Sequence, residues 1–297
     1  MILKNHFIKN YGEKAIRLKK LKLGLMNDNY FCQTHTGEYL LKVYLNKIKE
    51  EVAFEVEILE RLKQANFISP RLKSSLNGDL ISLFQGKPVI VYDYIKGKPL
   101  ENFDIHLIDA GKYLGKLHQL LQKFKPSFIR KSWDPPYFNK LVLSRRREFL
   151  KRSIPNGEFI LAFLKKELKK YSFPKLPSGV THQDLKPENI IVNEGKIAGF
   201  IDFDNSYIGA FLHDITTTII WTCFKGSVLK KDLLRSFIRG YESIRPLTVV
   251  ERKFFDQALR WRILREIFIG PLVTIKYSAE VPRRLNYFMR IYHKLAN

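Results

Sequence analysis

Short stretches of alternating hydrophobic and polar residues dominate the first hundred residues, and such alternation is typical of β-strands. The pattern predicts strands over residues 13–23, 29–34 and 39–44, and a further pair around Asn77-Gly78 that ends in residues 88–92. One helix is expected over residues 50–65. The Gly and Pro residues of 93–99 mark a connection. We therefore expect a sheet-rich lobe over residues 1–92, followed by a hinge over residues 93–97.

The remainder of the chain has a mainly helical pattern. Hydrophobic residues at helical spacing predict helices over residues 104–124, 137–171 and 211–297. Between the last two, residues 180–192 have the pattern of strand, loop and strand, and a turn at 193–195 leads into a strand over 196–201. We expect a larger, mainly helical lobe over residues 98–297, and an α+β fold for the chain.

The composition is that of a globular protein, because 45% of the 297 residues are hydrophobic and 27% are charged. Lys and Arg number 52 against 29 Asp and Glu, which gives a net charge of +23. These basic residues are spread along the whole chain, as on an ordinary solvated surface. We therefore expect no nucleic-acid partner, and a nucleic-acid role of the basic surface is the weaker alternative.

Membrane and export signals are absent from the pattern. No apolar run approaches the roughly 18 residues that a membrane helix needs, and the first residues lack the apolar core of a secretion signal. Only Cys32 and Cys223 are present, too few for a disulfide framework. The sequence therefore predicts a cytoplasmic location and no membrane partner.

The clearest chemical signal is the motif His182-x-Asp184-x4-Asn189-x12-Asp202-Phe203, whose polar residues lie at the ends of short apolar strands. Phosphoryl transfer requires a carboxylate that orients the acceptor hydroxyl and takes its proton, and hard oxygen ligands for magnesium at the nucleotide phosphates. Asp184 suits the first role, and Asn189 with Asp202 suits the second. The motif therefore predicts phosphoryl transfer.

This motif resembles that of the protein-kinase-like superfamily in its aminoglycoside/choline phosphotransferase branch, with Ile201-Asp202-Phe203 where protein kinases have Asp-Phe-Gly. The resemblance implies a bilobal fold with a small antiparallel-sheet N-lobe, a larger helical C-lobe and the nucleotide in the cleft between them. It also implies ATP and Mg²⁺ as cofactors, Asp184 as the catalytic base, and Asn189 and Asp202 as the metal ligands.

Two further residues are expected to support the catalytic loop rather than to react. The resemblance implies that Asp214, on the next helix, braces the loop through backbone hydrogen bonds. It also implies that the ring of His182 packs and hydrogen-bonds beneath the loop. A His that acts as the base is less favoured, because Asp184 lies beside the acceptor in the resembled enzymes.

A lysine on a predicted strand is expected to contact the nucleotide. In the resembled kinases a strand Lys reaches the α- and β-phosphates and pairs with a helix Glu, and Lys42 stands in the matching place. Glu55 falls within the apolar arc of the predicted helix at residues 50–65, and a buried carboxylate needs a cationic partner. We expect Glu55 to pair with Lys42; Glu51, one turn earlier on the same face, is the second candidate.

The resemblance implies several further nucleotide contacts. Asn27 and Asn29 belong to a hairpin whose backbone amides would face the phosphates, and a plain turn rich in Asn and Asp is the alternative. The carbonyl group of Asp93 and the amide of Ile95 would bind adenine. Lys186 would neutralise the transferring phosphoryl group.

Charge and spacing restrict the acceptor. Asp202 and Asp214 are twelve residues apart, which leaves no activation segment and argues against a protein kinase. Residues 203–297 contain sixteen Lys and Arg but eight Asp and Glu. This balance favours a small zwitterionic or anionic acceptor over the cationic substrates of aminoglycoside or choline kinases, which remain the alternative. A catalytically silent kinase-like binding module is the alternative from another class, and the intact motif argues against it.

Stretches in both parts of the chain resemble homoserine kinase of this superfamily: residues 27–31, 86–88, 221–224, 240–248 and 258–264. Gln183 and Asp204-Asn205 depart from the usual pattern beside the acceptor site. We hypothesise a small hydroxyl-bearing substrate such as homoserine. An Arg among Arg260, Arg262 and Arg265 would hold its carboxylate, with Arg262 and Arg265 at i,i+3 as a bidentate pair. A solvated basic helix face is the alternative interpretation.

Overall fold

The computed structural model describes residues 2–21, 26–101, 103–135, 137–152, 154–273 and 280–296. The chain forms two compact units. The sheet unit comprises Met1–Pro99, Lys125–Arg130 and Glu188–Asp204, and the helical unit comprises Leu100–Phe124, Lys131–Pro187 and Asn205–Asn297. Antiparallel strands and helices occur in both units, in agreement with the predicted α+β class. The lobe boundaries at residues 92 and 98 remain a prediction.

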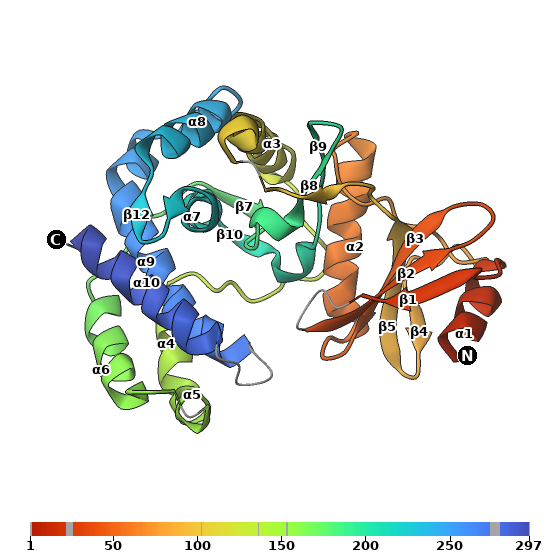
Figure 1. Cartoon of the computed structure of the whole chain (residues 1–297), viewed down its shortest axis with the longest axis horizontal. Helices are drawn as coiled ribbons and strands as arrows, with labels where there is room; N and C mark the ends of the chain where they lie inside the picture. The colour runs from red at the N-terminus through yellow and green to blue at the C-terminus, as the bar shows by residue number, and fades with distance from the viewer. Residues whose placement is uncertain are drawn as a thin grey trace. The chain divides into compact units, whose positions relative to one another are not determined.

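The sheet unit is built on a five-stranded antiparallel sheet with the strand order β1-β2-β3-β5-β4 (Figure 1). Its strands are β1 (Arg17–Lys20), β2 (Asn27–Gln33), β3 (Glu38–Tyr44), β4 (Ser82–Phe84) and β5 (Lys87–Asp93). The helix α2 (Lys49–Gln64) confirms the helix predicted over residues 50–65, whereas the helix α1 (Ile2–Tyr11) was not predicted. Figure 1 shows these two helices on opposite sides of the sheet.

Strand β3 shows how the two faces of this sheet differ. Its residues Tyr39, Leu41 and Val43 join an apolar cluster that contains Phe7 of α1. Because side chains alternate along a strand, the residue between them, Lys42, lies on the face that α2 covers. The strand thus places a charged side chain under a helix, where it needs a partner of opposite charge.

The hairpin between β4 and β5 turns later than predicted. Its turn residues are Gln85 and Gly86, with φ of 51° and 75°, and two successive positive φ angles are the requirement of a type I′ turn. Asn77-Gly78 lies in a separate turn before β4, where the Gly78 N–H donates to the Ser75 carbonyl oxygen at 2.9 Å. The hairpin predicted at Asn77-Gly78 is therefore wrong, because this turn does not join two paired strands.

A second, three-stranded sheet in the same unit has the order β6 (Lys98–Pro99), β8 (Ile190–Asn193) and β9 (Lys196–Phe200). Strands β8 and β9 form a hairpin whose turn, predicted at residues 193–195, is confirmed, with positive φ at Glu194 and Gly195. Strand β8 begins directly after Asn189, and β9 ends two residues before Asp202. The hairpin therefore carries the two predicted metal ligands at its open end.

The helical unit contains most of the helices. They are α3 (Phe103–Leu121), α4 (Tyr137–Ser144), α5 (Arg146–Lys151), α6 (Gly157–Leu168), α7 (Phe211–Thr222), α8 (Lys231–Glu242), α9 (Val249–Val273) and α10 (Glu280–Ala296). The unit also contains two antiparallel strand pairs, β7 (Ser178–Thr181) with β10 (Tyr207–Ala210), and β11 (Phe224–Lys225) with β12 (Val228–Leu229). The second pair interrupts the region that was predicted to be helical throughout. The prediction missed these strands because two residues are too few to show an alternation of hydrophobic and polar positions.

Helices α3 and α8 pack against each other at two glycines. A Cβ atom on Gly240 would collide with the Ile108 carbonyl oxygen, and one on Gly111 would collide with the Phe237 carbonyl oxygen. The absence of side chains at both positions lets the two backbones come into contact. This contact supports α7 and the strand pair β7–β10, which hold the catalytic loop described below.

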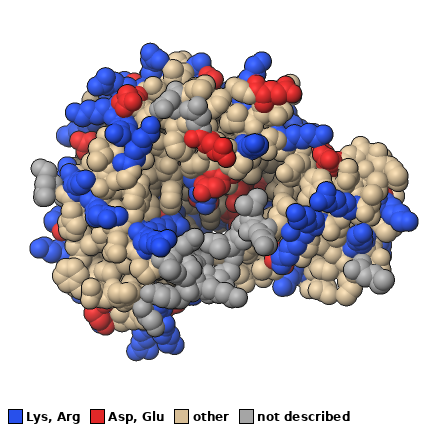
Figure 2. All heavy atoms as spheres, in the orientation of Figure 1, with Lys and Arg blue, Asp and Glu red and all other residues tan. Residues whose placement is uncertain are grey.

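Basic residues are scattered over the face of the molecule that Figure 2 shows, rather than gathered over one element. Within the part of the chain that the structure describes, no helix is long and apolar enough to cross a membrane.

Candidate active site

In the sheet unit, the ammonium group of Lys42 lies among carboxylates. Its Nζ atom is 3.2 Å from Glu55 Oε1 and 2.9 Å from Asp202 Oδ1, and Asp204 Oδ1 lies at 4.0 Å. The Lys42 side chain is 2% exposed. Burial alone would lower the pKa of this amine, but the carboxylates of Asp202 and Glu55 outweigh burial and hold the pKa well above its usual value. The carboxylates therefore favour the charged form of Lys42.

The partner of Lys42 on α2 is Glu55, as predicted. Glu55 is buried, and its second oxygen accepts a hydrogen bond of 2.8 Å from the Tyr44 hydroxyl. Glu51, the second candidate, instead accepts a hydrogen bond from the backbone N–H of Ile48 at the start of α2, which satisfies one of the unpaired donors of a helix end. The choice between the two glutamates is thus settled by a competing role for Glu51.

Asp204 is a prominent side chain of this cluster that sequence analysis missed. Its carboxylate accepts hydrogen bonds from Lys47 Nζ at 2.6 Å and from Asn27 Nδ2 at 2.9 Å, and its carbonyl oxygen accepts one from Arg130 at 2.8 Å. Burial would raise the pKa of Asp204, but the charges of Lys42 and Lys47 lower it below its usual value. The signal in the sequence was the second acid of Asp202-Phe203-Asp204, which we noted only as a departure from a family pattern.

The residues predicted to contact the nucleotide differ in their surroundings. Asn27 donates to Asp204, and Asn29 lies on β2 opposite Lys42 of β3. Asp93 ends β5 and donates its N–H to the Arg71 carbonyl oxygen at 2.9 Å. Ile95 packs its side chain against Gly199. Asn27 and Asn29, which were predicted to belong to a hairpin at the phosphates, both lie on strand β2, and residues 22–25 before them lie outside the described residues.

The two predicted metal ligands, Asn189 and Asp202, lie on backbone segments that are hydrogen-bonded to each other. The Ile201 N–H donates to the Asn189 carbonyl oxygen at 3.0 Å, directly before Asp202. Asp202 has a positive φ of 67° and a side chain that is 39% exposed, and one of its oxygens contacts Lys42. No group of three or more His, Cys, Asp or Glu side chains suited to a metal was found among the described residues. Mg²⁺ commonly takes only one or two carboxylates and completes its shell with water and substrate phosphates, so an Asn–Asp pair fits it.

In the helical unit, Asp214 of α7 holds the loop that follows β7. Its two carboxylate oxygens accept hydrogen bonds of 2.7 Å from the backbone N–H groups of His182 and Gln183. Burial would raise the pKa of Asp214, but its hydrogen bonds with His118 and the backbone keep it below the usual value. The predicted bracing role of Asp214 is therefore confirmed in geometry. His182 is buried, and its Nδ1 accepts a hydrogen bond from the Asp184 N–H at 3.3 Å.

The predicted base, Asp184, lies next in this loop. One of its oxygens, Oδ2, is 3.3 Å from Asn205 Nδ2 and 3.3 Å from Lys186 Nζ. Its side chain is 18% exposed, so it is neither sealed in the core nor fully solvated. Lys186, predicted to contact the transferring phosphoryl group, thus pairs with the base in this structure. Asn205 is a contact of Asp184 that sequence analysis noted only as a departure.

The arginines predicted to hold a carboxylate belong to α9. Arg262 and Arg265 are 2% and 7% exposed, so for these two the solvated basic face is the wrong interpretation. Arg262 is 3.4 Å from the Gln183 carbonyl oxygen, and Arg265 is 3.3 Å from Gln183 Oε1. Arg260 is only half-buried.

Known proteins are similar to this chain over most of its length. Residues 17–247 match APH, the phosphotransferase enzyme family. The homoserine kinase of Neisseria meningitidis serogroup B is 28% identical over 255 residues, covering 84% of this chain and 81% of the relative. The homoserine kinase of Chelativorans sp. is 27% identical over 310 residues, covering 96% and 92%.

The fold is also shared with a solved structure. An amicoumacin kinase in complex with AMP-PNP, Ca²⁺ and Ami superposes with a TM-score of 0.76 at 18% identity, covering 98% of this chain and 92% of that one. The predicted protein-kinase-like α+β fold is confirmed, as is the predicted enzyme class, an ATP-dependent kinase that phosphorylates a hydroxyl group of a small molecule. Because the family match spans most of the chain, this protein belongs to the phosphotransferase enzyme family.

Proposed function

We propose that this phosphotransferase transfers the γ-phosphoryl group of ATP to the hydroxyl group of homoserine, in the presence of Mg²⁺. The observation that carries the kinase chemistry is the ion-paired Lys42, held by Glu55 and Asp202. The similarity to homoserine kinases over 84% and 96% of the chain supports the choice of acceptor. On the face that Figure 2 shows, the basic side chains are scattered, which gives no support to a nucleic-acid partner.

In the proposed reaction, Asp184 accepts the proton of the acceptor hydroxyl as the new O–P bond forms and the bond between the γ-phosphorus and the ADP oxygen breaks. Asp184 is suited to this role because its loop is fixed by Asp214 while its own carboxylate remains partly exposed. Lys186, 3.3 Å from Asp184 Oδ2, would turn to the transferring phosphoryl group. Lys42 would donate to the α- and β-phosphates.

Asn189 and Asp202 would hold Mg²⁺ through an amide oxygen and a carboxylate oxygen, the hard ligands that this ion prefers. The ion would supply positive charge that stabilises the phosphate oxygens during transfer. Asp202 is suited to this role because its side chain is exposed and only one of its carboxylate oxygens contacts Lys42. The other oxygen is available to bind the ion.

The remaining nucleotide contacts belong to the same proposal. The Asp93 carbonyl group and the Ile95 amide would bind adenine, and the strand around Asn27 and Asn29 would face the phosphates. Residues 1–92 would then form the nucleotide-binding lobe, 93–97 the hinge, and 98–297 the lobe that carries the acceptor. We also propose a cytoplasmic location, because Cys32 and Cys223 are free and buried and free thiols are typical of a reducing compartment.

A coupled assay of ADP release tests the acceptor. The purified chain would be supplied with Mg-ATP and, in separate reactions, homoserine, choline or kanamycin. We expect the highest kcat/KM for homoserine. Turnover of choline or kanamycin without turnover of homoserine would contradict the proposed acceptor, and ATP-dependent turnover of no acceptor would favour a catalytically silent binding module.

A further inference from the structure

The helical unit contains two buried arginines whose donors are not all satisfied among the described residues, Arg262 and Arg265. Arg265 is 7% exposed, and no carboxylate of the described residues lies within 4.0 Å of its guanidinium group. Its contacts are a long hydrogen bond to Gln183 Oε1 and the ring of Trp133, 5.8 Å from the guanidinium carbon. Its Nε–H finds no acceptor among the described residues. A guanidinium group removed from water in this way is costly unless an anion joins it.

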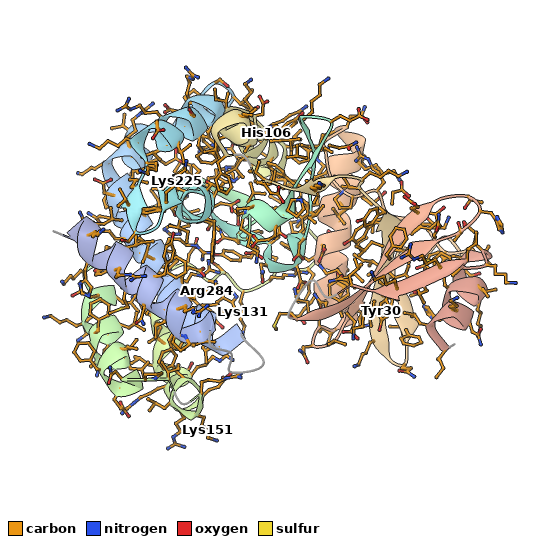
Figure 3. All side chains as sticks on the ribbon, viewed as in Figure 1. Tyr30, His106, Lys131, Lys151, Lys225 and Arg284 are labelled. Carbon is orange, nitrogen blue, oxygen red and sulfur yellow. The ribbon has the colours of Figure 1, made fainter. Side chains whose placement is uncertain are left out.

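Arg262, one helical turn earlier, is only partly neutralised. It lies 2.9 Å from Glu266, but Glu266 also pairs with Arg284 at 2.6 Å. Arg284, which belongs to α10, is labelled in Figure 3. One carboxylate thus serves two guanidinium groups. The Nε and Nη1 atoms of Arg262 have no hydrogen-bond partner among the described residues, although the side chain is 2% exposed. Together with Arg265, the cluster has more buried donors and more positive charge than its own acceptors satisfy.

These donors lie beside the catalytic loop. Both arginines contact Gln183. Arg262 donates to the backbone carbonyl oxygen of Gln183, and Arg265 donates to its side-chain oxygen, Oε1. Gln183 directly precedes Asp184, the proposed base. It is itself buried, it has a positive φ of 65°, and its amide nitrogen donates to Thr181 Oγ1 at 3.1 Å. Gln183, which departs from the usual family pattern, therefore connects the two arginines to the catalytic loop directly before Asp184.

We propose that Arg262 and Arg265 form a binding site for the carboxylate group of the acceptor, and that this site selects a hydroxy acid or hydroxy amino acid over an amino alcohol. This inference rests on the proposed kinase function and adds the group that is recognised. A carboxylate would accept hydrogen bonds from the vacant N–H groups and supply the missing negative charge. Glu266 would act as a positioning residue, because it fixes Arg262 while Arg284 shares its charge.

A purely structural role for the two arginines makes a different prediction. If they only fix the loop through Gln183, the loss of Arg265 would misplace Asp184 and lower kcat for every acceptor by the same factor. If they bind the carboxylate, the loss raises KM for acceptors that have a carboxylate and leaves the others unchanged. Homoserine and 3-aminopropan-1-ol form the matched pair for this test, because they differ only by the carboxylate.

The activity experiment measures kcat and KM for both acceptors in wild type, Arg265→Ala, Gln183→Ala and Arg252→Ala. Arg252 is the matched control, an exposed arginine on the same helix that pairs with Glu242. A charged hydrogen bond contributes enough binding energy that we expect Arg265→Ala to raise KM for homoserine about 10- to 100-fold. KM for 3-aminopropan-1-ol should stay the same. Gln183→Ala should affect homoserine far less than Arg265→Ala, because both cations remain.

A binding experiment tests the proposed carboxylate site independently of turnover. The melting temperature of wild type and of Arg265→Ala is followed while homoserine, 4-hydroxybutyrate or 3-aminopropan-1-ol is added. We expect the two carboxylates to stabilise wild type and not the variant, and the amino alcohol to stabilise neither. Equal stabilisation of wild type and variant by the carboxylates, or none of either, would overturn the carboxylate site.

The outcomes separate this proposal from the proposed function. Homoserine turnover with the same KM in wild type and Arg265→Ala, or with the same loss for both acceptors, overturns the carboxylate site and leaves the kinase function intact. Absence of homoserine turnover, combined with stabilisation of wild type alone by 4-hydroxybutyrate, overturns the acceptor and supports the carboxylate site.

Discussion

Lys42 in the sheet unit and Arg265 in the helical unit are both buried cations, but they differ in whether a carboxylate lies beside them. Lys42 contacts two carboxylates directly, and a third lies 4.0 Å away. Arg265 contacts an amide oxygen and an aromatic ring. The first charge is balanced by the chain, so it belongs to a preformed framework. The second is left without a counter-charge, which is the arrangement expected where a ligand supplies the anion.

The difference also bears on stability. Breaking a buried ion pair by removing one partner leaves the other charge buried and unpaired, which costs several kcal/mol. Removing a charge that has no partner relieves a desolvation cost instead. Stability measurements on the protein without ligand can therefore separate the two kinds of site, independently of any assay of activity.

The largest effect is expected for Lys42→Met. Glu55, Asp202 and Asp204 would lose their shared cation, and we expect the free energy of unfolding to fall by about 3–5 kcal/mol. Denaturant unfolding at pH 7 measures this change. The control is Lys20→Met, which removes the exposed ion pair with Asp28 and should leave stability unchanged. Equal stability of Lys42→Met and wild type would contradict a balanced framework.

The matched substitution in the helical unit, Arg265→Met, should have the opposite sign. In the protein without ligand we expect its free energy of unfolding to be equal to that of wild type or higher, by up to about 4 kcal/mol, because an unpaired buried charge is replaced by an apolar chain of similar length. Destabilisation comparable to that of Lys42→Met would show that Arg265 has a counter-charge within the protein and would remove the contrast.

A smaller effect is expected from the pH dependence of Asp204. Its pKa is lower in the folded protein than the value of 3.8 of the free side chain. A carboxyl with a lowered folded pKa stabilises the fold above the unfolded pKa, and this stabilisation is lost as the pH falls toward the folded pKa. Asp204→Asn should therefore be less stable than wild type at pH 7, and the difference should shrink below about pH 4. A constant difference between pH 7 and pH 2 would show that Asp204 does not act through its charge.

The pairing of Lys42 with Glu55 could be predicted because each belongs to a local pattern. Strand alternation places Lys42 under the helix, and helical periodicity places Glu55 in the apolar arc. Asp204 could not be found in this way, because its partners come from segments far apart in the chain: Asn27, Lys47 and Arg130. Nothing in the spacing of these residues indicates that they meet.

The same limit applies to other parts of the fold. The pattern of residues 180–201 predicted the loop and the hairpin β8–β9, and the family resemblance implied the brace by Asp214. The helix α1 was not predicted, although the spacing of Leu3, Phe7 and Tyr11 is that of one helix face. For Arg262 and Arg265, sequence alone left burial open, because α9 is covered on several sides by other helices and its charged residues follow no single face.

Phosphorylation of the homoserine hydroxyl group, with Asp184 as the base, can be tested in one set of experiments. The most direct test combines ³¹P NMR of the product with single-substitution kinetics of Asp184→Asn, and measures ATP affinity by calorimetry. We expect a phosphomonoester on the homoserine hydroxyl, a fall in kcat of at least about 100-fold in Asp184→Asn, and ATP affinity like that of wild type. Wild-type turnover in Asp184→Asn, or a product without phosphate on homoserine, would contradict it.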